Sequence, residues 1–239
     1  MSYGTVVSPP TPRAPKRLTL LFQLYLTNQA SRRFTRVALA GTPLSGEEFA
    51  VLSYLHVDGE HRSGRWPEII ETGERLHRAL ANVPRPGFIA TRSDPWSIGD
   101  RVAWGEASAE PYRRIGLVNR LIDLLVPIVT SSQVVHGDLT GNVLFADDLP
   151  PAVIDFSPYW RPTAYASAIV VADALVWEGA DRSLVTKALR IDAFGQYLAR
   201  ALIFRIVSAA IGGFEGDDKA VSAAYRAAVE TAVEVSGVR

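Results

Sequence analysis

The stretch from Val134 to Phe156, VVHGDLTGNVLFADDLPPAVIDF, most constrains what this chain can fold into. Short runs of apolar and β-branched residues alternate with polar ones, and two prolines follow a pair of aspartates. This pattern predicts short strands at residues 134–135, 143–145 and 153–155, with a turn at 147–151. We therefore expect a small hairpin that carries a histidine, an asparagine and several acids.

Most of the remaining chain has the apolar spacing of helices, so the expected fold class is α+β and mainly helical. The chain has 239 residues, of which 48% are hydrophobic, enough to bury a core in one large domain. The predicted helices span residues 18–39, 47–56, 67–82, 111–126, 164–177, 183–190, 193–211 and 219–236. Residues 84–100 are predicted to be rich in loops.

The polar residues of the hairpin are of the types that phosphoryl transfer requires. A carboxylate must orient the accepting hydroxyl, and oxygen ligands must hold Mg²⁺ on the phosphates. Carboxylate and amide oxygens are ligands that Mg²⁺ accepts. The hairpin offers such groups in the order His136-Gly137-Asp138, Asn142, Asp155-Phe156.

Purely structural roles are open for some of these residues. Asp147 and Asp148 are typical turn residues, and Asp138 could cap a local turn. His136 could be a hydrogen-bonded histidine of the interior. Asp155 is harder to explain in this way, because an acid that ends a buried strand needs a partner or a metal.

The order of these residues resembles the catalytic and metal-binding segments of the aminoglycoside phosphotransferase and choline kinase-like family, relatives of protein kinases. HGDLTGNVLF and AVIDF carry the resemblance, and GERLHRAL is similar to the helix that opens the family's C-terminal lobe. WSIGDRVAWGE and DFSPYWRPTAYA resemble an actinobacterial branch of the family. The resemblance implies a kinase-like C-terminal lobe over residues 60–239, with ATP and Mg²⁺ as cofactors and a small-molecule hydroxyl as acceptor.

The resemblance also implies roles for individual residues. They are Asp138 as catalytic base, Asn142 and Asp155 as ligands of Mg²⁺, and His136 as a brace for the loop. Trp160 and Arg161 are candidate acceptor-side residues, because they follow Asp155-Phe156 where an acceptor-side loop is expected.

One spacing departs from the family's pattern. The family commonly places four residues between the aspartate and the asparagine, whereas only Leu139, Thr140 and Gly141 separate Asp138 from Asn142. Gly141 could allow a tighter loop that still aims the asparagine inward.

Two parts of a kinase nucleotide site are missing from the sequence. Of the three lysines, only Lys16 precedes the catalytic loop, and it lies in a proline-rich stretch. No glycine-rich loop stands before the hairpin either, although such a loop and a strand lysine hold the phosphates in kinases. A catalytically inactive kinase-like lobe that acts as a binding or scaffold module is therefore the alternative to an active enzyme.

The N-terminal part suggests a third hypothesis. Residues 1–17 are proline-rich and predicted to be a disordered lead-in. Residues 18–59 resemble the start of a MarR-type winged-helix regulator, with a long dimerisation helix and the first helix of a DNA-binding unit. The resemblance stops before any recognition helix, so we expect a homodimer through residues 18–39 and no sequence-specific nucleic-acid binding.

Charge and composition restrict the partners further. The 25 basic and 25 acidic residues cancel, which gives no overall attraction for nucleic acid or an anionic membrane. The chain has no cysteine, which excludes disulfides and cysteine-bound zinc. The apolar run at residues 18–26 is too short to span a bilayer. We therefore expect a cytoplasmic protein without membrane contact.

Overall fold

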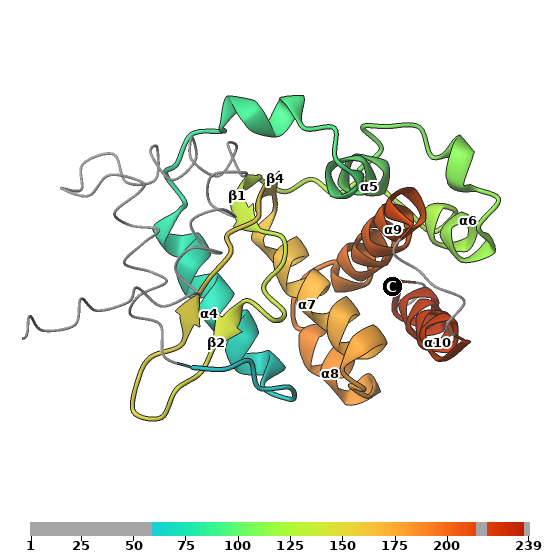
Figure 1. The fold of residues 1–239 in the computed structure, drawn as a ribbon. Helices are drawn as coiled ribbons and strands as arrows, with labels where there is room; N and C mark the ends of the chain where they lie inside the picture. Colours follow the sequence, from blue (N-terminus) through green and yellow to red (C-terminus); the bar gives the residue numbers. More distant parts are fainter. Residues whose placement is uncertain (1–58, 214–218, 237–239) are drawn as a thin grey trace, which may run out of the picture.

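The computed structural model describes residues 59–213 and 219–236. The helices predicted at 18–39 and 47–56, and the segment that resembles MarR regulators apart from Gly59, lie outside the described residues. The described part is mainly helical with two small antiparallel sheets, so the predicted α+β class is confirmed (Figure 1). The elements are α4 (Trp66–Ala79), η1 (Gly87–Thr91), α5 (Pro95–Ala103), η2 (Glu110–Tyr112), α6 (Gly116–Ile122), β1 (Gln133–His136), β2 (Val143–Leu144), β3 (Ala152–Val153), β4 (Pro158–Arg161), α7 (Thr163–Trp177), α8 (Arg182–Ala188), α9 (Phe194–Gly212) and α10 (Lys219–Ser236).

Helices α7 and α9 form the centre of the core. Both are apolar around most of their circumference, so neither has a face suited to water. Helix α9 packs against α5, α6, α7 and α10, and these helices bury the largest hydrophobic cluster. By length and composition α9 could cross a membrane, but most of it is buried among these helices, as in the core helix of a globular domain.

The strands differ from the predicted single hairpin. Strand β2 pairs with β3 in antiparallel fashion, with Val143 opposite Val153, as predicted. Strand β1 pairs with β4, which the sequence analysis does not predict, with Val135 opposite Tyr159. A proline at each end of PYWRP hides the strand signal of β4, because proline usually marks a strand end.

This pairing brings two connecting segments together. Residues 137–142 join β1 to β2, and residues 154–157 join β3 to β4. Backbone hydrogen bonds link the two segments, from Gly137 N–H to the Ser157 carbonyl at 2.9 Å and from Ile154 N–H to the Asn142 carbonyl at 2.9 Å. Strand β1 itself packs against α4 and α7, which fixes both segments on the helical core.

The predicted loop-rich stretch at 84–100 is wrong in its second half, where α5 begins. The Asp94 carboxylate accepts a hydrogen bond from the Ser97 N–H at 3.0 Å, and proline occupies the first turn. Aspartate before proline is a helix-start signal that the sequence analysis overlooks. The helix predicted at 111–126 is also shorter, because only Gly116–Ile122 is α-helical.

Candidate active site

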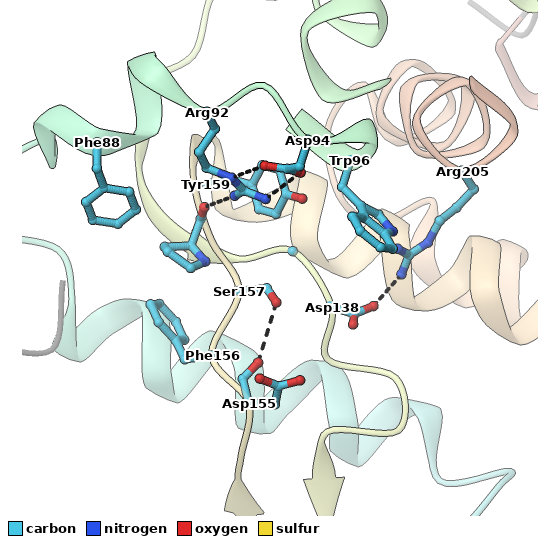
Figure 2. Close-up of a pocket in the computed structure, with 12 residues that line it drawn as sticks. Phe88, Arg92, Asp94, Trp96, Asp138, Asp155, Phe156, Ser157, Tyr159 and Arg205 are labelled. Atoms are coloured by element: carbon cyan, nitrogen blue, oxygen red, sulfur yellow. Dashed lines mark hydrogen bonds and ion pairs between the residues drawn. The ribbon is translucent and has the colours of Figure 1, made fainter. Parts of the chain in front are cut away.

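The two connecting segments place Asp138 and Asp155 at one cavity. Asp138 follows β1, and Asp155 follows β3. A cavity of about 410 Å³, named here the Asp155 cavity, lies against both segments and the start of α5 (Figure 2). It is lined by Phe88, Arg92, Asp94, Trp96, Gly137, Asp138, Asp155, Phe156, Ser157, Pro158, Tyr159 and Arg205. The structure thus brings together the two acids on which the sequence analysis depends.

The ring of His136 links the two segments through hydrogen bonds. Its Nδ1 accepts a hydrogen bond from the Asp138 N–H at 3.0 Å, so the ring proton is on Nε2, which faces the Ile154 carbonyl at 3.3 Å. The backbone N–H of His136 donates to Nε2 of His77 on α4 at 3.0 Å. Burial lowers the pKa of His136 to about 4. A neutral ring with both nitrogens engaged is a structural group rather than a proton carrier.

Asn142 lies against Asp138. Its amide donates to the Asp138 carbonyl at 2.7 Å and to the Asp138 carboxylate at 3.3 Å. Gly141 has a φ of +80°, so the shortened loop depends on a conformation that favours glycine. Asn142 is not among the residues that line the Asp155 cavity, and its role as a metal ligand stays a prediction.

Arg205 of α9 holds Asp138 from the other side. Its guanidinium donates to Asp138 Oδ1 at 2.7 Å and to both carboxylate oxygens of Asp173 on α7, at 2.7 and 2.5 Å. The side chain of Asp173 is 5% exposed and that of Arg205 is 14% exposed. Burial lowers the pKa of Arg205, but the two carboxylates raise it by more, so this cation stays charged.

Sequence reasoning missed Arg205 and Asp173, although a signal existed. Each is a charged residue within a helix that is apolar on nearly all sides. A charge at such a position needs a partner of opposite sign, so Asp173 could have been expected to pair with an arginine of α9, although the sequence leaves open whether that is Arg200 or Arg205.

The surroundings of Asp155 disfavour its negative charge. Partial burial raises its pKa, and the nearby charge of Asp138 raises it further. Among the side chains that the structure describes, at residues 59–213 and 223–236, no arginine or lysine forms an ion pair with it. Its φ of 45° is rare for a residue other than glycine, and such backbone strain clusters at functional sites.

The chemistry of these donors fits Mg²⁺ only as part of a nucleotide complex. No group of three metal-binding side chains exists in the part of the chain that the structure describes. Proteins commonly hold Mg²⁺ through one or two carboxylates, while substrate phosphates and water complete the shell. The Asp155 carboxylate at the cavity suits that arrangement.

Trp160 and Arg161 lie at a different cavity. They line a space of about 230 Å³, named here the Arg161 cavity, and neither lines the Asp155 cavity. Arg161 donates to Asp100 at 2.6 Å and to Glu106 at 2.5 Å, which ties β4 to α5 and the loop after it. Their role on the acceptor side stays a prediction.

A comparison with known families agrees with this geometry. Residues 9–159, more than half of the chain, match the Phosphotransferase enzyme family. No curated protein matches the chain at a significant level. The match includes the loop and strand segments that carry Asp138 and Asp155. It also includes the segment from 18 to 59, whose resemblance to MarR regulators stays a prediction. The chain therefore belongs to the phosphotransferase enzyme family.

Proposed function

We propose that the protein transfers the γ-phosphoryl group of ATP, bound with Mg²⁺, to a hydroxyl group of a small molecule. The observation that carries the proposal is that Asp138 and Asp155 line one cavity from two segments joined by hydrogen bonds. Phosphoryl transfer needs one carboxylate at the acceptor hydroxyl and another that faces the metal-bound nucleotide. In this proposal residues 60–239 form the kinase-like C-terminal lobe.

Asp138 orients the acceptor and takes its proton. Arg205 binds Oδ1 of Asp138, whereas Oδ2 has, among the described residues, only the long contact of 3.3 Å from Asn142. Oδ2 therefore receives the hydroxyl proton while the acceptor oxygen forms a bond to the γ-phosphorus. The bond from this phosphorus to the β–γ bridging oxygen breaks, and ADP leaves with its electron pair.

Asp155 is the residue that would hold Mg²⁺, with Asn142 as the second candidate. When bound, the ion neutralises phosphate oxygens and positions the transferred group. His136 keeps Asp138 and the Asp155 segment in register through its two ring nitrogens. The cations of this cavity in the described part of the chain are Arg92, which pairs with Asp94, and Arg205, which pairs with Asp138 and Asp173.

The second candidate is a catalytically inactive scaffold. The engagement of Asp138 by Arg205 favours it, as does the shortage of lysine before the catalytic loop. A homodimer through residues 18–39 and a MarR-like regulatory role concern residues outside the described part, and we keep both as proposals.

Turnover of ATP separates an enzyme from a scaffold. The full chain is incubated with γ-labelled ATP, Mg²⁺ and a mixture of hydroxylated compounds, and label release or transfer is measured. We expect Asp138→Asn to lower the rate by about 100-fold or more, the usual contribution of a general base. Wild-type protein that consumes ATP no faster than Asp138→Asn would support the scaffold instead.

A further inference from the structure

We propose that the acceptor is an uncharged polyhydroxyl compound of monosaccharide size, and that it binds in a second cavity beside Asp138. This inference rests on the proposed function, whose acceptor it specifies. The cavity, named here the Trp177 cavity, measures about 300 Å³, at the lower end of the usual range for small-molecule sites. It is lined by Trp96, Asp138, Thr140, Asp173, Trp177, Arg205, Ser208, Ala209 and Tyr225.

The two cavities meet at three shared residues. Asp138, Trp96 and Arg205 line both, whereas Asp155 lines only the first. Figure 2 shows Trp96 and Arg205 grouped beside Asp138, away from Asp155. A hydroxyl in the Trp177 cavity and a phosphate in the Asp155 cavity can therefore both approach the same carboxylate, as a transfer between two ligands requires.

The charges of the Trp177 cavity favour a neutral ligand. Its charged residues are two carboxylates and one arginine, and that arginine bonds both carboxylates. An anionic ligand would approach two carboxylates and a guanidinium that is already engaged. A polycation would find two carboxylates that already share a cation, so neither kind of charge is well matched here.

The uncharged polar groups of the wall include hydroxyls. Ser208 is 2% exposed, and its Oγ has no hydrogen-bond partner among the described residues. Thr140 Oγ1 is also buried. Its hydroxyl interacts with the Asp173 carboxylate, which lowers the pKa of Asp173, although burial raises that pKa by more. The Ser208 hydroxyl lies at the contact with Gly99 of α5, and a change of its rotamer toward the cavity would let it donate to a ligand hydroxyl.

The apolar part of the wall is aromatic and open to the ligand. Trp96 is 41% exposed and Trp177 is 52% exposed, and both line this cavity. Tyr225 supports Trp177 in an edge-to-face contact with ring centroids 5.8 Å apart. Flat aromatic faces pack well against the C–H faces of a sugar-like ring, whose hydroxyls point outward to polar groups.

Most of this wall lies outside the part of the chain that matches the family. The match ends at residue 159, whereas Asp173, Trp177, Arg205 and Ser208 all follow it. The proposed acceptor site thus draws most of its wall from α7, α9 and α10, which follow the matched residues.

Calorimetric titration with defined probes tests the proposal. Glucose and myo-inositol serve as neutral polyols, glucose 6-phosphate as an anion and kanamycin as a polycation, each titrated into the full chain with and without ATP and Mg²⁺. We expect a neutral polyol to bind and the charged probes to bind at least tenfold more weakly. Binding by the charged probes alone, or by no polyol, would overturn the inference.

Matched variants test whether the polyol binds in the Trp177 cavity. Ala209→Phe fills the Trp177 cavity, and Ala210→Phe makes the same change at the next, exposed position of α9. Trp177→Ala removes a wall of this cavity, and Leu189→Ala, which truncates an exposed side chain that lines none of the three named cavities, is its control. We expect Ala209→Phe and Trp177→Ala to weaken polyol binding about tenfold or more and the two controls to leave it unchanged. Equal loss in a variant and its control would contradict the site.

Binding and transfer are scored separately. A polyol that binds as expected but receives no phosphate from ATP would contradict the proposed function and not the site. A transferase that phosphorylates only charged compounds would contradict the acceptor class and not the function.

Discussion

At the scale of single residues, Arg205 is a cation that lines both the Asp155 cavity and the Trp177 cavity. One guanidinium bonds Asp138, which faces both cavities, and Asp173, which is buried within the core. Removal of one partner from a buried ion pair leaves the other charge without compensation, which costs more than the pair itself contributes. Arg205 therefore acts both as a structural partner of Asp173 and as a positioning group for Asp138.

We predict that Arg205→Gln lowers the free energy of unfolding by about 3 kcal/mol, because Asp173 is left buried and unpaired. Arg205→Gln combined with Asp173→Asn should recover part of the loss. Arg120→Gln is the matched control, because Arg120 pairs with Glu230 at an exposed site, where ion pairs contribute little. Urea denaturation measures all three variants. Equal stability of Arg205→Gln and Arg120→Gln would contradict the account.

His77 gives the stability of the protein a predicted dependence on pH. Burial, together with the proximity of His136, lowers the pKa of His77 from 6.5 to about 4. The unfolded chain takes up a proton near pH 6.5 while the folded chain resists it. This contribution to stability is therefore complete above pH 6.5 and is lost as pH falls towards 4.

We predict that His77→Gln removes up to about 3 kcal/mol of the pH dependence of unfolding between neutral pH and pH 4. Glutamine can still accept the hydrogen bond from the His136 N–H, so the variant should fold. Unfolding curves measured across this range test the prediction. Identical pH slopes for the variant and the wild type would show that His77 does not contribute to this pH dependence.

At this scale the sequence indicated candidate residues that share a short motif, two of which line the Asp155 cavity, and missed Arg205, which contacts Asp138 from α9. Asp138, Asn142 and Asp155 lie within one stretch of 23 residues that can be read directly. Arg205 and Asp173 reach the same place from α9 and α7, and no local spacing encodes such a contact.

At the scale of elements, the contact between α5 and α9 positions the start of α5, which lines both cavities. Gly99 of α5 lies directly on α9, where a Cβ atom would come within 2.8 Å of the Phe204 carbonyl and 2.3 Å of the Ser208 hydroxyl. Glycine is needed here for close approach of two helices. The same helix begins at Asp94 and carries Trp96, so its placement affects both cavities.

We predict that Gly99→Ala destabilises the protein by about 1–3 kcal/mol, the usual effect of overpacking a tight interface. Gly116→Ala is the control, because a Cβ at Gly116 meets nothing within 4 Å. Thermal unfolding of the two variants measures the difference. A Gly99→Ala variant as stable as Gly116→Ala would show that α5 can move away from α9 without loss.

The long helices α7, α9 and α10 were predicted well, whereas several shorter elements were missed or predicted with wrong bounds. Helix α10 has its predicted bounds, and α7 and α9 agree to within a residue or two. Strand β4 and helix α5 were missed, because each lies in a proline-containing stretch whose local signal is mixed. The pairing of β1 with β4 is a contact between distant segments, which the hydrophobic pattern of either strand leaves open.

At the scale of the whole molecule, the family match ends before the helices that form most of the hydrophobic core. The match covers residues 9–159, whereas helices α7 to α10, which follow it, form most of the buried core. The part of the chain that identifies the family thus carries Asp138 and Asp155. The part beyond it supplies Arg205 and the wall of the Trp177 cavity. The residues behind the family assignment thus lie close together in the sequence, whereas those of the proposed acceptor site come from separate helices.

The central claim is that Asp155 holds the metal of a bound nucleotide, and calorimetric titration of ATP tests it most directly. ATP is titrated into the full chain with and without Mg²⁺, for wild type, Asp155→Asn and the turn-residue control Asp147→Asn. The account predicts that wild type and Asp147→Asn bind ATP with Mg²⁺ and that Asp155→Asn binds at least tenfold more weakly. No ATP binding by the folded wild-type protein, or equal affinity in all three, would contradict it.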